Sequence, residues 1–137
     1  EKAAQRLSAE DFEHLEQLQR ESERSVAIED MQGFTAAEIG LHSLILSSAK
    51  NARLLKMIES IKDLTYTERM MAVRSGDDMQ KEFSLQNVRK AVEEHRRIVD
   101  ALRGRNSREA GEAMRQHIRA VQGRLLQFLD LPEAEAD

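Results

Sequence analysis

The sequence predicts an all-α protein, folded as an antiparallel bundle of about six helices. Breakers of regular structure are rare, since the 137 residues include one proline and six glycines. Residues that favour helices (Ala, Leu, Glu, Arg and Gln) are abundant. No stretch alternates for long with the period of two that strands require. Short connections between the predicted helices favour packing against sequence neighbours, and hence one bundle.

The first two predicted helices are separated by a cap signal. A short helix over 2–7 is followed by Ser8, which is typical of an N-cap, with Asp11 three residues later as its capping-box partner. The helix that begins there is expected to reach about Glu23. Its inner face carries Phe12, Leu15 and Leu18.

The middle of the chain holds two more predicted helices. One spans 28–48, and the other starts near Asn51. The apolar face of the latter carries Leu54, Leu55, Ile58, Ile61 and Leu64. The segment 75–78, with the sequence SGDD, is the expected loop after them.

Two long helices complete the predicted bundle. One covers 84–102 and is followed by Gly104, which is typical of the residue just after a helix. Asn106 or Ser107 is expected to cap the last helix, which reaches about Leu129. Residues 1–130 therefore form one helical domain, and the acidic tail 131–137 is expected to be disordered.

Composition excludes several classes of function. A formal net charge of −4 argues against nucleic-acid binding through bulk electrostatics. The absence of cysteine excludes disulfides, thiolate metal sites and cysteine nucleophiles. No Trp, one Tyr and four Phe offer no stacking platform for single strands. No stretch is long enough to span a membrane, so no membrane contact is expected, and no signal peptide is visible. The lack of cysteine fits a cytoplasmic protein, which is the expected location.

Three of the four histidines fall on predicted inner faces. In the helix over 84–102, His95 stands in the middle of apolar residues that recur at steps of three and four: Leu85, Val88, Val92, Val99 and Leu102. His117 holds the same place in the last helix, among Ala110, Met114, Val121, Leu125 and Phe128. His14 lies beside glutamates on a polar face and is assigned no role.

His42 adds a carboxylate to this pattern, because Glu38 precedes it by four residues and the two can face one object. A single buried histidine is more often a satisfied core residue, and such a Glu–His pair is common on helices. Three imidazoles and a carboxylate are nevertheless costly to bury without compensation. If they converge, one divalent ion satisfies all four. These ligands suit zinc, nickel, manganese, iron or cobalt, of which the first three are favoured.

Three blocks of the sequence stand in the order of a known family: 38–51 (EIGLHSLILSSAKN), 94–102 (EHRRIVDAL) and 110–118 (AGEAMRQHI). A fourth segment, 3–11, is similar to the end of the family's first helix and the start of its second. Together they resemble the C-terminal effector-binding domain, called FCD, of GntR-type transcription regulators of the FadR subgroup. The resemblance covers almost the whole chain.

The resemblance implies that the metal ligands are Glu38, His42, His95 and His117. This is the same quartet that the helix faces indicate. Glu38 stands where the family usually has Asp, so the longer carboxylate could hold the ion differently. Leu41 stands where the family usually has Phe, which is a change of packing only.

Two further groups of residues are candidates for contact with an effector. Asn51 could donate a hydrogen bond to the effector or to a metal-bound water, although a capping role explains it equally well. The cations on the relevant helices lie off the apolar stripes, so solvent-facing positions are favoured for Arg89, Arg96 and Arg115.

The resemblance implies a sensor and not an enzyme. Such domains bind a small organic acid in the bundle interior, form homodimers, and contact DNA only through an N-terminal winged helix-turn-helix domain. That domain is absent from this chain, which is expected to start within the family's first helix. Two alternatives remain open at this point: a metal-dependent enzyme, for which no general base or nucleophile stands beside the quartet, and a metal-free structural module. A di-metal bundle of the hemerythrin type needs more ligands. Metal, effector, operator and the direction of regulation are left open.

Overall fold

The computed structural model describes residues 2–50, 53, 56, 66–67, 70–71 and 76–128. Over these residues all regular structure is helical, which confirms the predicted fold class. The helices are α1 (Lys2–Arg6), α2 (Ala9–Ala27), α3 (Met31–Ala49), α5 (Asp78–Arg103) and α6 (Ser107–Phe128). The predicted helix from Asn51 onward, Ser75 and the acidic tail lie outside the described residues.

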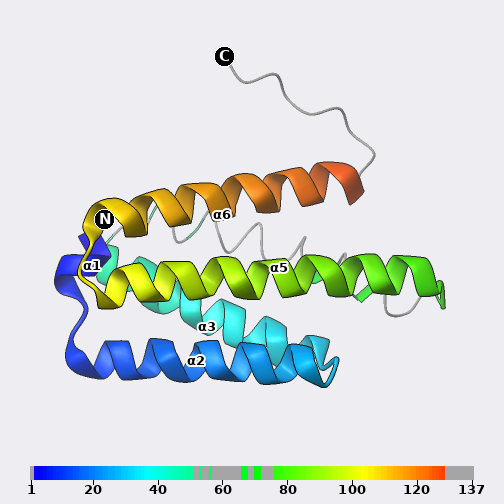
Figure 1. Cartoon of the computed structure of the whole chain (residues 1–137), viewed down its shortest axis with the longest axis horizontal. Coiled ribbons are helices and arrows are strands. Elements are labelled where there is room, and N and C mark those ends of the chain that lie inside the picture. Colours follow the sequence, from blue (N-terminus) through cyan, green and yellow to red (C-terminus); the bar gives the residue numbers. More distant parts are fainter. Residues whose placement is uncertain are drawn as a thin grey trace, which may run out of the picture.

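The described helices form two antiparallel pairs (Figure 1). α3 packs on α2, and α6 packs on α5. α5 also contacts α2, so it lies between α2 and α6 in Figure 1. The short α1 lies at one end of the bundle, where it contacts α3, α5 and α6. Among the described residues, no helix is both long and apolar enough to cross a bilayer.

α2 begins as predicted and ends later than predicted. The Ser8 hydroxyl accepts a hydrogen bond from the Asp11 backbone N–H at 3.1 Å, and the Asp11 carboxylate accepts one from the Ser8 N–H at 2.8 Å. The helix then continues to Ala27, four residues beyond the expected end at Glu23. Small hydroxyl side chains, Ser22 and Ser25, carry its buried face over this last part, so apolar periodicity does not mark it.

The turn between α2 and α3 corrects the predicted start of the next helix at Ile28. Ile28 is 66% exposed and ends α2, and Glu29 adopts a left-handed backbone with φ of 57°. The Asp30 carboxylate then caps α3 by accepting from the Gly33 N–H at 2.9 Å. Further along, a Cβ on Gly40 would lie 2.8 Å from a methyl of Leu18, so glycine there permits the close approach of α2 and α3.

α5 starts six residues before the predicted position 84. Gly76 adopts φ of 70°, as expected of a loop residue, and Asp77 caps the helix by accepting from the Met79 N–H at 2.9 Å. Ser84, the expected start, is a buried residue inside the helix. The strong cap therefore begins the helix well before its apolar stripe begins.

The connection between α5 and α6 falls where it was predicted, with one correction. Gly104 follows the last residue of α5 but has φ of −69°, and Arg105 is the left-handed residue with φ of 52°. Asn106 caps α6, because its side-chain oxygen accepts from the Glu109 N–H at 3.1 Å.

The core divides into two apolar clusters along the bundle. One, near α1, includes Leu7, Leu15, Leu41, Ile45, Ile98 and Leu102. The other includes Met31, Phe34, Leu85, Val88 and Ala91. On α5, His95 falls between Ala91 of one cluster and Ile98 of the other. A polar site is therefore enclosed between two apolar regions of the same bundle.

Candidate metal centre

The structure brings three of the predicted histidines together from three different helices. His42 lies on α3, His95 on α5 and His117 on α6, and their residues are 8%, 0% and 2% exposed. The Nε2 atom of His95 lies 3.1 Å from that of His42 and 3.3 Å from that of His117. The apolar stripes of α5 and α6 carry the rings inward, as their spacing predicts.

Hydrogen bonding alone accounts poorly for this arrangement. A ring nitrogen carries either one hydrogen or one in-plane lone pair, so it can make one linear hydrogen bond. His95 Nε2 faces two other Nε2 atoms at hydrogen-bond distance. With neutral rings, one of the two contacts is left poorly satisfied, which is costly in a buried site.

A divalent ion fits the spacing of the nitrogens. Imidazole nitrogens bound to one ion at about 2.0–2.1 Å stand about 2.8–3.4 Å apart as neighbouring ligands in tetrahedral or octahedral geometry. The observed separations of 3.1 and 3.3 Å fall in that range. One ligand nitrogen from each ring lies within 4.8 Å of the other two. The three rings together could hold a metal ion.

Glu38 lies beside this group and is not a member of it. Its side chain is 13% exposed, and its nearer carboxylate oxygen is 4.0 Å from His95 Nε2. That separation is an electrostatic contact and too long for a hydrogen bond. The predicted carboxylate is thus placed next to the imidazoles, on the same helix as His42. Asn51, the other candidate, lies outside the described residues.

A second carboxylate, Glu94, which the helix-face pattern does not predict, contacts one of the histidines directly. Glu94 Oε2 accepts from His117 Nδ1 at 2.7 Å, and Arg124 donates to both oxygens of Glu94 at 2.8 and 2.9 Å. Partial burial acts to raise the pKa of Glu94, but hydrogen bonds from Arg124 and His117 outweigh it and lower the pKa from 4.5 to about 2. Glu94 is therefore ionised at neutral pH. Arg124 follows His117 by seven residues and hence lies on the same helix face. This spacing is the sequence signal from which Arg124 could have been predicted.

The three arginines considered for an effector face away from the cluster. Each donates to a carboxylate outside the cluster: Arg89 to Glu82, Arg96 to Glu16 and Glu23, and Arg115 to Glu112. Arg89 and Arg115 are about half exposed, as the sequence favours, whereas Arg96 is 32% exposed and bridges α5 to α2.

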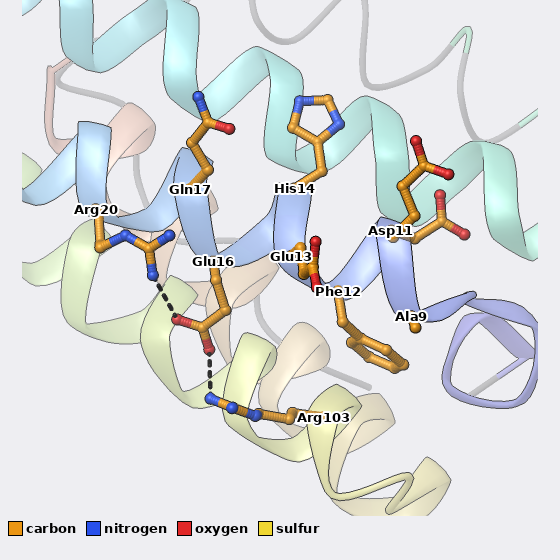
Figure 2. Close-up of a pocket in the computed structure, with 10 residues that line it drawn as sticks. Ala9, Asp11, Phe12, Glu13, His14, Glu16, Gln17, Arg20 and Arg103 are labelled. Atoms are coloured by element: carbon orange, nitrogen blue, oxygen red, sulfur yellow. Dashed lines mark hydrogen bonds and ion pairs between the residues drawn. The ribbon is translucent and has the colours of Figure 1, made fainter.

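A pocket of about 920 Å³ lies elsewhere, along the exposed face of α2 (Figure 2). Glu16 stands between Arg20, at 3.7 Å, and Arg103, at 3.2 Å. His14, exposed as predicted, is also part of its lining. None of the three clustered histidines lines this pocket. The pocket and the histidine cluster are thus separate sites, and the buried cluster is the better candidate because its ligand atoms converge.

Comparison with known proteins gives one match. A family model, the FCD domain, matches residues 1–120. No curated protein and no solved structure matches the chain significantly. The matched range contains all three blocks of sequence resemblance and all three clustered histidines. With an all-helical fold and a match over most of its length, this chain belongs to the FCD domain family, the C-terminal effector-binding domains of GntR-family transcription regulators.

Proposed function

We propose that this domain binds one divalent metal ion through His42, His95, His117 and Glu38, and that a small organic acid binds there as the effector. The observation that carries the proposal is the convergence of three buried Nε2 atoms at 3.1 and 3.3 Å. Family membership supports the general role, a ligand-sensing domain of a transcription regulator.

The three imidazoles and the carboxylate of Glu38 have different roles in this proposal. The imidazoles supply neutral nitrogen ligands, which zinc, nickel and manganese accept. Glu38 supplies negative charge, and a modest change of its side-chain torsions would bring its oxygen, now 4.0 Å from His95 Nε2, into ligand range. When bound, the ion provides a Lewis-acid site with open positions for an effector carboxylate. Burial of the three rings strengthens this charge interaction by lowering the local dielectric.

The regulatory step follows from the origin of the ligands. Because His42, His95 and His117 come from α3, α5 and α6, an effector that alters their coordination alters the relative positions of three helices. Binding that differs between two arrangements of a homodimer shifts their populations. In this proposal residues 1–130 form the effector-binding and dimerisation unit of a cytoplasmic protein. A winged helix-turn-helix domain outside this chain makes the DNA contacts.

The first test is metal content. The purified domain is expected to contain about one divalent ion per chain by mass spectrometry, and His95→Ala is expected to contain none, because it removes the central ligand. His14→Ala is the matched control, since it removes an exposed histidine of the same bundle. Wild-type protein that contains no ion, and that zinc, nickel and manganese do not stabilise, would overturn the metal site.

The second test concerns the effector. Small carboxylates are screened by thermal shift against the metal-loaded domain and against the same protein in EDTA. The proposal expects an acid that raises Tm only when metal is present. It also expects that acid to be recovered unchanged after prolonged incubation, whereas turnover would favour the enzyme alternative.

A further inference from the structure

A chain of three contacts links Arg124 to the histidine cluster. Arg124 donates from both terminal nitrogens to Glu94, at 2.8 and 2.9 Å, and Glu94 accepts from His117 Nδ1 at 2.7 Å. His117 Nε2 in turn faces His95 Nε2 at 3.3 Å. The side chains of Glu94, Arg124 and His117 are only 19%, 17% and 2% exposed. This series of contacts therefore leads from near the surface into the centre of the histidine cluster.

The direction of these hydrogen bonds determines the state of the imidazole. Both oxygens of Glu94 accept hydrogen bonds from the Arg124 guanidinium, so this carboxylate acts as an acceptor and the hydrogen between Glu94 and His117 belongs to Nδ1. A neutral His117 ring then has no hydrogen on Nε2. The lone pair of Nε2 is left directed at the point where the three histidines meet. The opposite tautomer would place a hydrogen there and block that nitrogen as a ligand.

The bidentate pair determines where the carboxylate lies. Two parallel bonds to a planar guanidinium fix both position and rotation of the Glu94 carboxylate, which a single bond would leave free. Glu94 lies on α5, next to His95, whereas Arg124 and His117 lie two turns apart on α6. The same contacts thus set the register of α5 against α6 at the level of the cluster.

We propose that Glu94 and Arg124 are positioning residues for the metal site: Arg124 holds Glu94, and Glu94 holds His117 as the tautomer whose Nε2 is available as a ligand. This inference rests on the proposed function for its metal-binding consequence. Neither residue is a ligand in the proposal.

The experiment compares metal affinity in four proteins. Glu94→Gln keeps the shape of the side chain, but its amide can accept from or donate to His117, so the tautomer is no longer dictated. Its affinity for Zn²⁺ and Ni²⁺, from competition with a chelator, is expected to fall about 10- to 100-fold. Arg124→Lys keeps the charge and loses the bidentate geometry, so an intermediate loss is expected. Glu112→Gln, which breaks an exposed pair with Arg115 on α6, should stay within about twofold of wild type.

A second readout separates positioning from a merely structural role and needs no metal. Nitrogen NMR of the imidazoles in EDTA is expected to show His117 as the Nδ1–H tautomer in wild type and as a mixture in Glu94→Gln. If Glu94→Gln does not fold, the same two measurements are made on Arg124→Lys, which is the milder change. Unchanged affinity and unchanged tautomer in a folded variant would overturn the inference. A wild-type domain that binds no metal, but whose tautomer shifts in Glu94→Gln, would overturn the proposed function and leave the positioning role supported.

Discussion

Glu94 and Arg96 lie two residues apart on α5, yet their ion pairs face different neighbours. Glu94 contacts His117 and Arg124 of α6. Arg96 contacts Glu16 and Glu23 of α2, at 3.2 and 2.6 Å. Since residues two apart on a helix point about 200° apart, the same helix uses one kind of interaction on both sides. The two networks differ in what lies beyond them: an imidazole cluster in one case and solvent in the other.

The difference in burial gives the two networks different energetics. Glu94 and Arg124 are 19% and 17% exposed, whereas Arg96 and Glu23 are 32% and 40% exposed. Glu16, the second partner of Arg96, is 16% exposed, so the contrast lies in the Arg96–Glu23 pair. Exposed pairs contribute about 0–1 kcal/mol each, because water screens them. A pair shielded from water adds little net stability when intact, but removal of one partner leaves a charge poorly solvated. Both networks join α5 to a neighbouring helix, and we expect the inner one to be the more costly to break.

The largest effect on stability is expected from the inner network. Arg124→Met leaves the ionised Glu94 without its bidentate partner, so the free energy of unfolding should fall by about 2 kcal/mol. Urea unfolding in EDTA measures this without any contribution from metal. Arg119→Met, at an exposed position of the same helix, is the control. A loss no larger than that of Arg119→Met would show that breaking the inner network costs no more than removing an exposed charge.

A smaller effect is expected from the outer network. Arg96→Met keeps the apolar stem and removes the charge, so the free energy of unfolding should fall by only about 0.5–1 kcal/mol. The difference from wild type should shrink in about 1 M NaCl, because salt screens exposed charges. Destabilisation equal to that of Arg124→Met, or insensitive to salt, would contradict the assignment of this network to the surface.

The smallest expected effect is a pH dependence of the outer network. Burial acts to raise the pKa of Glu23, but hydrogen bonds from Gln19 and Arg96 outweigh it and hold the pKa below its ordinary value of 4.5. A carboxylate with a lowered pKa stabilises the fold above the unfolded value and loses that contribution as the pH falls through the folded value. Between about pH 5 and about pH 3, Tm should therefore fall slightly more in wild type than in Glu23→Gln. If Tm depended on pH in the same way in the two proteins, Glu23 would make no pH-dependent contribution to stability.

Local signals in the sequence predicted much of this fold. The Ser8 and Asp11 capping box, the Asn106 cap and the apolar stripe around His95 all lie where they were expected. These signals succeed because each depends on residues within about one or two helical turns. The predicted helix ends were wrong where polar residues, and not the apolar stripe, determine how far the helix extends. Buried serines extend α2 to Ala27, and the Asp77 cap starts α5 early.

The sequence predicts which helix faces the histidines of the site occupy, but not how those faces meet. Periodicity turns His95 and His117 inward, but their convergence with His42 depends on how α3, α5 and α6 pack, which no local pattern contains. Glu94 shows the same limit. It lies off the apolar stripe and beside His95, so its orientation toward α6 is decided by the neighbouring helix. The metal-ligand assignment stays a prediction.

If the histidine cluster binds a metal ion as proposed, the sequence separations within it affect how long the fold lasts. His42 and His95 are 53 residues apart, and His95 and His117 are 22 residues apart. Joining these rings through one ion would close two large loops, as a reversible cross-link does, and would restrict the unfolded chain. The chain could then unravel fully only after it released the ion. The supply of metal in the cell would thereby set the lifetime of the domain against proteases, in addition to its ability to sense an effector.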